Sequence, residues 1–290
     1  MSMASQGAEP APAKTGAIAG EPRGGDVVMR HRLSTRLWHW INALTLFVML
    51  MSGLMIFNAH PRLYWGEYGA NYDRAWLQIG SRGDEGFLKV GDYRLETTGV
   101  LGLWKDRQGV VKRRAFPWWA TIPSSYSLAD GRIWHFFFAW VLVIAGLGYG
   151  MVSLLNRHIQ RDLLPRGEEL RLGHLWHEIC DHARLRLPSG AGALRYNSLQ
   201  KLAYLSVLFV LLPLIILTGL TMSPGVNAAW PWLLDLLGGR QSARSVHFLC
   251  AFGFVLFILV HIAMVILAGP INEIRSMITG RFRLPKERDQ

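Results

Sequence analysis

The sequence is poor in cysteine and in charged residues, and each shortage excludes a class of protein. Only two cysteines occur, Cys180 and Cys250. Cys250 falls within a long apolar run, so no disulfide between them is expected. The absence of a C-x-x-C-H pattern excludes covalent attachment of a c-type haem. Charged residues make up 18% of the chain, below the about 25% typical of soluble domains, and no nucleic-acid-binding motif accompanies the basic excess.

Apolar residues are instead concentrated in four blocks, each long enough to span a bilayer. No apolar signal-peptide core precedes the first block, so we expect that block to remain as an uncleaved anchor. We predict an all-α membrane protein, a bundle of four transmembrane helices within residues 30–285, preceded by a disordered tail at 1–29 that is rich in Ala, Gly and Pro. The helices are expected at about 38–57, 133–155, 202–222 and 246–268.

The distribution of basic residues predicts the topology. Arg and Lys are dense in the N-terminal arm, in the connection 156–201 and in the C-terminal tail, whereas the connection 223–243 contains only Arg240. The positive-inside rule then makes both termini and the connection 156–201 cytoplasmic, in a bacterial inner membrane. The aromatic-rich connection 58–132 becomes periplasmic. We expect it to form a folded cap, the alternative being an exposed irregular loop.

The last apolar run, Arg244–Ala268, contains two histidines, and ionisable residues in membrane helices usually mark function. His247 and His261 are 14 residues apart, so they lie on the same helix face about 21 Å apart along the axis. Gly253 between them would let a flat ring approach the backbone. One histidine near a helix end is often only an interfacial residue, so the interpretation depends on partners in other helices.

A short Arg-x-x-His pattern recurs at the water-facing start of three helices. In each copy the Arg stands about one turn closer to water than the His. A non-covalent b-type haem needs this arrangement, because its iron binds an imidazole within the apolar layer and its propionates bind a cation at the boundary. The alternative is that Arg and Trp only anchor the helix ends. The copies are Arg36-Leu-Trp-His39, Arg132-Ile-Trp-His135 and Arg244-Ser-Val-His247.

Depth in the membrane predicts how the ligands pair around two haem irons. His135 and His247 both enter from the outer face and would bind one haem. His39 and His261 belong to the cytoplasmic half and would bind the other. The second pair fits less well, because the predicted helix ends put its members at depths that differ by about 8 Å. His31 lies further out and would enlarge this difference.

These residues give the chain a resemblance to bacterial membrane cytochrome b subunits of thiosulfate reductases, nickel-iron hydrogenases and respiratory formate dehydrogenases. The resemblance covers about residues 30–285 and is strongest to subunits that accompany periplasmic molybdopterin oxidoreductases. It implies two b haems with the pairing above, a quinone site near one haem, and a periplasmic redox partner. Sulfite-oxidase-like and thiosulfate-reductase-like partners are both compatible with it.

The quinone site is suggested by the stretch Tyr196-Asn-Ser-Leu-Gln-Lys201, which is similar to the Y-N-x-x-Q-K stretch of formate dehydrogenase cytochrome subunits. Asn197, Gln200 and Lys201 could donate hydrogen bonds to quinone oxygens and relay protons. The alternative is an ordinary polar helix start.

The remaining histidines carry less weight. The segment GHLWHEICDH contains His174, His177 and His182, but its second gap is one residue too long for a zinc-protease motif. A solvated amphipathic helix is the favoured interpretation. His60 and His158 lie at helix ends and are expected at the interface.

The sequence thus predicts a membrane-anchoring dihaem cytochrome b that transfers electrons between the quinone pool and a periplasmic, molybdopterin-containing oxidoreductase. It is expected to contact lipid and quinone but no nucleic acid. One rival is a stand-alone quinone-coupled haem oxidoreductase of the superoxide oxidase or ferric reductase type. The other is a haem-free protein whose histidines relay protons.

Overall fold

The computed structural model describes residues 25–157, 159, 163–165, 167–184 and 197–285. Within these ranges the chain is mostly helical, and four helical stretches are long and apolar enough to cross a membrane. The predicted bundle of four membrane helices is confirmed at this level. The stretches are α1 (Leu33–Phe57), α2 (Leu128–Leu155), the continuous stretch Ser198–Thr221 and α8 (Arg240–Ala268).

Each stretch begins earlier than hydropathy alone predicts, at residues 33, 128, 198 and 240 rather than 38, 133, 202 and 246. In α2 and α8 specific groups satisfy backbone N–H groups of the extra turn. The Ser127 side chain accepts a hydrogen bond from Asp130 N at the start of α2. The Gly66 carbonyl accepts from Gln241 N and Ser242 N at the start of α8.

The third stretch is not a uniform α-helix. It consists of α4 (Ser198–Ser206), a π-helical turn (Val207–Leu211) and α5 (Leu212–Thr221). Pro213 follows two residues after the π turn. Proline has no N–H to donate to the preceding turn, which explains why the regular α-helical ladder is interrupted here.

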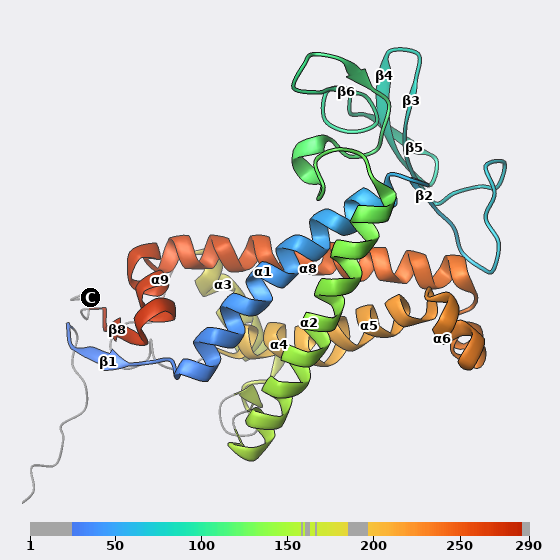
Figure 1. The fold of residues 1–290 in the computed structure, drawn as a ribbon. Helices are drawn as coiled ribbons and strands as arrows, with labels where there is room; N and C mark the ends of the chain where they lie inside the picture. The colour runs from blue at the N-terminus through green and yellow to red at the C-terminus, as the bar shows by residue number, and fades with distance from the viewer. Residues whose placement is uncertain (1–24, 158, 160–162, 166, 185–196, 286–290) are drawn as a thin grey trace, which may run out of the picture.

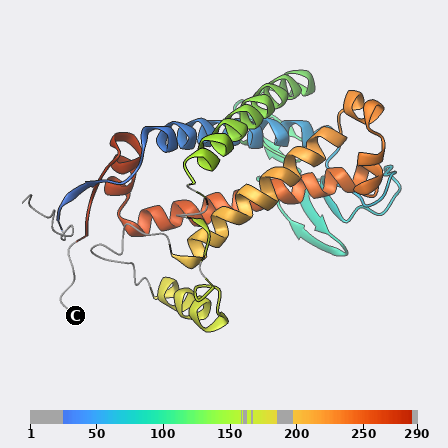
Figure 2. The ribbon, with the colours of Figure 1, turned by 90° about the horizontal axis from the view of Figure 1, so that it is seen from below.

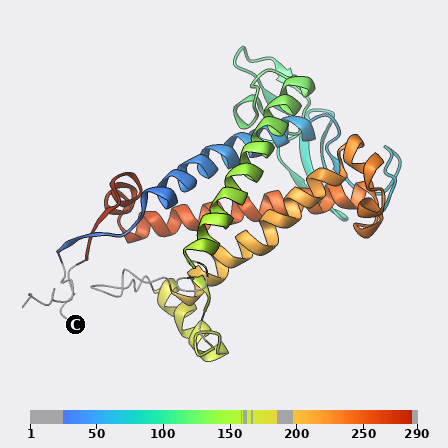
Figure 3. The ribbon, with the colours of Figure 1, turned by 60° about the horizontal axis from the view of Figure 1, so that its bottom comes forward.

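The four stretches form two packed pairs. α1 packs chiefly against α2, and α5 packs chiefly against α8. Figure 2 shows α1 beside α2 and α5 beside α8, and Figure 3 shows α2 running steeply across the other pair. We call the end of the bundle where α1 and α5 stop and α2 and α8 begin the cap end, and the opposite end the terminal end.

The connection between α1 and α2 folds over the cap end (Figure 1). The connection contains β-strands, so the predicted all-α class holds for the bundle but is wrong for this connection. Phe57 of α1 and Leu63, Leu77, Ile79 and Ala115 form its buried core, against which Phe248 of α8 also packs. The cap contains an antiparallel sheet of four strands in chain order: β2 (Arg62–Leu63), β3 (Leu77–Arg82), β4 (Glu85–Val90) and β5 (Tyr93–Glu96). A separate hairpin follows, formed by β6 (Trp104–Lys105) and β7 (Val111–Lys112). A 3-10 turn covers Trp118–Ala120.

Hydrogen bonds fix this cap to α8. Trp76 Nε1 donates to Ser245 Oγ at 2.9 Å, and Ser245 Oγ donates to the Tyr64 carbonyl at 2.5 Å. Gly66 N donates to Ser242 Oγ at 2.7 Å. The start of α8 is thereby positioned by the cap as well as by its packing on α5.

The terminal end is closed by a strand pair. β1 (Val27–Met29) pairs antiparallel with β8 (Arg281–Arg283), which follows α9 (Pro270–Thr279). Arg30 pairs with Glu273 of α9 at 3.2 Å. Val27–Met29 were expected in a disordered tail; the pairing with β8 overrides their poor local signal. Residues 1–24 lie outside the described residues.

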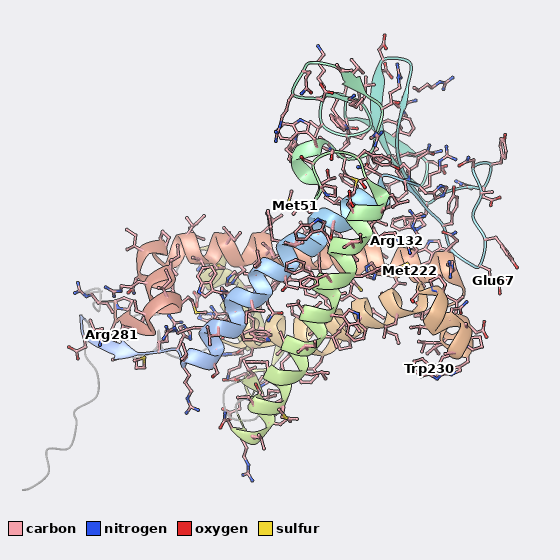
Figure 4. The ribbon with its side chains drawn as sticks, in the orientation of Figure 1. Met51, Glu67, Arg132, Met222, Trp230 and Arg281 are labelled. Carbon is pink, nitrogen blue, oxygen red and sulfur yellow. The ribbon has the colours of Figure 1, made fainter. Side chains whose placement is uncertain are left out.

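Three shorter helices complete the described part of the chain. α3 (Leu172–Ala183) lies in the connection between α2 and α4, within the range 156–201. α6 (Pro224–Ala229) and α7 (Trp232–Leu236) lie between α5 and α8 at the cap end. Figure 4 shows Trp230 beside α6, Arg132 near the start of α2, and Arg281 at the opposite, terminal end.

Candidate haem-binding site

His135 of α2 and His247 of α8 face each other near the cap end. Their ring centroids are 6.2 Å apart and their planes are inclined by 62°. A haem iron bonded to two imidazole nitrogens at about 2 Å each would separate the ring centroids by about 6 Å. The spacing of this cap-end pair therefore fits two axial ligands of one iron.

The second nitrogen of each cap-end imidazole is held in the same way. His135 Nδ1 lies 3.1 Å from both the Met49 carbonyl and Ser52 Oγ of α1. His247 Nδ1 lies 3.1 Å from both the Ile215 carbonyl and Thr218 Oγ1 of α5.

These contacts fix the protonation of the rings. Ser52 Oγ and Thr218 Oγ1 donate to carbonyls of their own helices, so each hydroxyl is available to accept from an imidazole. We therefore assign the proton to Nδ1 in both rings, where a carbonyl and a hydroxyl can accept it. The other nitrogen, Nε2, is left with the lone pair that a metal ligand needs.

Two glycines make room for these rings. A Cβ atom at Gly53 would lie 3.4 Å from His135 Cε1, and a Cβ atom at Gly219 would lie 3.4 Å from His247 Cε1. The cap-end site thus consists of two equivalent halves, each with one candidate ligand histidine lying over an x-x-x-Ser/Thr-Gly segment of the neighbouring helix.

Sequence reasoning missed these four supporting residues and chose a different glycine. In the structure the space over Gly253 is taken by the Leu211 side chain, at 3.2 Å from a built Cβ atom. The signal that could have found the right glycines is the repeated pattern Met49-x-x-Ser-Gly53 and Ile215-x-x-Thr-Gly219 in two of the predicted membrane helices.

His39 of α1 and His261 of α8 form a second pair near the terminal end. Their ring centroids are also 6.2 Å apart, with the planes inclined by 53°. The sequence predicted that the two histidines lie at different depths, and the structure reduces this difference. α1 begins at Leu33, so His39 lies about as far from its helix end as His261 lies from Ala268. This terminal-end pair also has the spacing of two axial ligands.

Aromatic rings, rather than hydrogen bonds, surround the terminal-end pair. The Phe257 ring stacks on His261 at 5.9 Å, and the Trp40 ring meets the edge of His39 at 5.2 Å. Among the described residues His39 Nδ1 is buried without a hydrogen-bond partner. Three other side-chain atoms of α1 are also buried without a hydrogen-bond partner in the described part of the chain: Arg36 Nε, Trp38 Nε1 and Thr45 Oγ1. Buried polar groups are rarely left unpaired, and of these atoms Arg36 Nε, one turn from His39 towards the helix end, is the donor that a haem propionate could accept from.

The three predicted propionate-binding arginines differ in their surroundings. Arg36 donates to the Ile278 carbonyl of α9, and Arg244 donates to the His60 and Arg62 carbonyls of the cap. Arg132 is exposed at the start of α2, with its guanidinium over the Phe136 ring. None of the three pairs with an acidic side chain in the described part of the chain, so their charges are not neutralised there.

The predicted quinone residues have structural partners. Asn197 and Gln200 form a capping box at the start of α4, in which Asn197 Oδ1 accepts from Gln200 N at 2.8 Å and Gln200 Oε1 accepts from Asn197 N at 3.3 Å. Lys201 pairs with Glu169 at 2.8 Å. Tyr196 lies outside the described residues.

Among the described residues the histidines of α3 belong to no group of three or more potential metal ligands. His174 Nε2 lies 3.2 Å from Glu178, and His177 Nε2 lies 3.3 Å from Asp181. Burial alone would raise the pKa of Glu178, but hydrogen bonds from Ser198 N, Leu199 N and Ser198 Oγ lower it below its usual value. Glu178 thus joins α3 to the first turn of α4. His158 and the His182 side chain lie outside the described residues.

The other two histidines lie just outside the membrane helices. Burial, and then the positive charge of Arg30, lower the pKa of His31 to about 4. Burial, and then Arg244, lower the pKa of His60, whose ring stacks on Tyr64 in the cap. Neither lies in one of the two facing pairs.

Four membrane-length helices with two facing pairs of imidazoles define a membrane haem protein of the cytochrome b class. The family model described as prokaryotic cytochrome b561 matches residues 30–280. The chain belongs to this family and is therefore an integral membrane electron-transport protein with b-type haem. The resemblance to bacterial cytochrome b subunits inferred from the sequence is confirmed.

Two curated relatives carry names that describe subunits of redox enzymes. The putative protein-methionine-sulfoxide reductase subunit YedZ1 of Azospira oryzae is 34% identical over 147 residues, which is 51% of this chain and 69% of the relative. The probable Ni/Fe-hydrogenase B-type cytochrome subunit of Cupriavidus necator is 23% identical over 258 residues, which is 84% of this chain and 82% of the relative. No solved structure matches the chain.

Proposed function

We propose that the chain binds two b-type haems, one between His135 and His247 and one between His39 and His261. The observation that carries the proposal is the equal centroid separation of 6.2 Å in two pairs at opposite ends of one bundle. Each bound haem would supply one-electron redox chemistry. The protein supplies the imidazoles, their orientation and an apolar surrounding.

The arginines at the two ends complete this proposal. Arg36 lies one turn from His39, Arg132 one turn from His135, and Arg244 one turn from His247. Guanidinium groups at these positions would offset the negative charge of the propionates where the haem edges reach polar surroundings. Arg36 and Arg244 also hold α9 and the cap in place, so they serve two roles.

We propose that the two haems connect the quinone pool with a periplasmic redox enzyme, with both termini in the cytoplasm of a bacterial inner membrane. The names of both relatives, which describe subunits of larger enzymes, support a protein partner. The cap offers a surface for it, since Tyr68, Tyr72 and Tyr93 are 83%, 101% and 88% exposed. Exposed tyrosines of this kind are common in protein interfaces. A molybdopterin enzyme is the partner class that the sequence resemblance favours.

The quinone site is proposed at the start of α4, where Asn197, Gln200 and Lys201 lie. In the structure these side chains cap the helix and bind Glu169, so a quinone would have to share or replace these contacts. The location supports the proposal, because α4 begins at the terminal end of the bundle, where His39 and His261 also lie.

A haem count and a redox spectrum of the purified chain test the function. We expect a b-type reduced-minus-oxidised spectrum and about two haems per chain by pyridine haemochrome assay. One haem per chain would contradict the double site. The variants His39→Ala and His135→Ala would then identify the vacant pair, because removing a histidine of that pair would leave the haem content unchanged. A chain that purifies folded without haem would overturn the proposal.

A further inference from the structure

A cavity of about 440 Å³ lies between the β6–β7 hairpin and the end of α1, outside both histidine pairs. Met55 of α1 and the adjoining Asn58 line it, and Trp104 and Trp118 of the cap are among its apolar lining residues. The hairpin lies high in the cap, above the end of α1 (Figure 1). Three cationic side chains and one carboxylate line the cavity: Arg107, Lys112, Arg114 and Asp106.

The single carboxylate in the cavity is already neutralised. Asp106 pairs with Lys112 at 3.2 Å and accepts hydrogen bonds from Gln108 N and Val110 N at 3.0 and 2.9 Å. These bonds hold the pKa of Asp106 below its usual value, against the opposing effect of burial. Within the part of the chain that the structure describes, the two positive charges on Arg107 and Arg114 therefore have no acidic partner.

Both guanidinium groups lie over aromatic rings. Arg107 lies over the Trp118 ring at 4.1 Å, and Arg114 lies over the Tyr126 ring at 3.5 Å. A stacked guanidinium is restricted in orientation while its N–H edge stays available. Neither group donates a hydrogen bond to any residue that the structure describes, and Arg114 Nη1 is buried without a partner.

We propose that this cavity binds a small anionic ligand that presents a carboxylate, sulfate or phosphate group to Arg107 and Arg114. A buried N–H group that lacks a partner is costly, and an oxyanion would satisfy it with a charge-assisted hydrogen bond. The planar N–H fork of arginine matches these oxyanions better than it matches chloride. The aromatic walls leave room for an apolar portion of the ligand.

The test is equilibrium dialysis of the haem-loaded full chain against radiolabelled sulfate, at an ionic strength held constant with chloride. We expect saturable binding of about one sulfate per chain. Arg114→Gln should weaken it by about tenfold or more, since a hydrogen bond to a charged group is lost.

The neighbouring arginine provides the matched control. Arg113 directly follows β7 and precedes Arg114, but its guanidinium binds the Gly83 carbonyl and Asp84 and does not line the cavity. Arg113→Gln should leave sulfate binding unchanged. Arg107→Gln, a change at an exposed side chain, should weaken binding even if Arg114→Gln fails to fold. Binding that does not saturate, or that Arg107→Gln and Arg114→Gln leave unchanged, would overturn the proposal.

Discussion

The two histidine pairs have the same spacing but are built differently. In the cap-end pair both Nδ1 atoms contact a carbonyl and a hydroxyl of a neighbouring helix. In the terminal-end pair, within the described residues, His39 Nδ1 is buried without a hydrogen-bond partner and the rings are held by Phe257 and Trp40. The protein thus orients one pair by hydrogen bonds and the other by packing.

This difference has consequences for assembly and for redox potential. Hydrogen bonds from Nδ1 fix the tautomer and ring orientation before any metal binds, and they raise the basicity of the ligand. The cap-end site is therefore pre-organised. Among the described residues His39 Nδ1 of the terminal-end site has no such partner, so the haem itself would have to fix the orientation of this ring. We expect the cap-end site to be the more robust and its haem to have the lower potential.

The largest expected effect comes from removing a ligand. His261→Ala should remove the terminal-end haem and leave the cap-end haem, so the pyridine haemochrome assay should fall from about two haems per chain to about one. His247→Ala should remove the cap-end haem and, if the terminal-end site depends on the pre-organised one, both.

His60→Ala is the control for these two variants. His60 lies at the cap end but in neither pair, and its ring stacks on Tyr64. The His60→Ala variant should retain both haems. Unchanged haem content in His247→Ala would contradict the proposed pairing, whereas complete loss in His261→Ala would reverse the order of robustness.

The contrast between the two pairs also shows what the sequence could reveal. The 14-residue spacing of His247 and His261 and the Arg-x-x-His copies were sufficient to predict both pairs, because helix periodicity fixes face and depth. The four helices followed from hydropathy. The sheets of the cap and the β1–β8 pairing depend on contacts distant in sequence, which no local pattern encodes.

The hydroxyl and glycine contacts of the cap-end site were harder to predict for a different reason. Ser52, Gly53, Thr218 and Gly219 are ordinary small residues of membrane helices, and such residues usually serve helix packing. Their role becomes visible only when the neighbouring histidine is placed over them. Conversely, Asn197 and Gln200 were readable as a helix start, and the structure gives them that role.

A substitution at Asn197 separates the quinone role from the capping role and acts at the terminal end alone. Asn197→Ala should slow haem reduction by quinol by about three- to tenfold while both haems are retained. Asn197→Ser preserves the helix cap but removes the amide. If a quinone binds the amide, stopped-flow reduction should be as slow in Asn197→Ser as in Asn197→Ala. Recovery of the wild-type rate in Asn197→Ser would show that only the cap matters.

A smaller effect is expected from the hydroxyls that distinguish the cap-end pair. Ser52→Ala and Thr218→Val each remove one acceptor from a ligand Nδ1–H and leave the carbonyl. The loss of one hydrogen bond worth about 1 kcal/mol corresponds to a rise of about 40 mV in the potential of the cap-end haem. Redox titration should show one shifted and one unshifted haem.

Ser276→Ala is the control for the hydroxyl variants, because it removes a buried hydroxyl of α9 that donates to the Glu273 carbonyl, outside both histidine pairs. It should shift neither potential. Equal shifts of both haems in Ser52→Ala, or none, would remove the basis for treating the two sites as different.

The smallest effect concerns the pH dependence of folding stability, which we expect His31, beside the strand pair at the terminal end, to influence. Burial and Arg30 lower the pKa of His31 from its usual value of 6.5 to about 4, so His31 is neutral in the folded chain at neutral pH. Between these two values the unfolded chain binds more protons than the folded one. Stability should therefore fall as the pH drops from about 6.5 towards 4. Thermal unfolding at pH 7 and pH 5 should show a smaller acid loss in His31→Gln than in the wild type; an equal loss would mean that another group controls it.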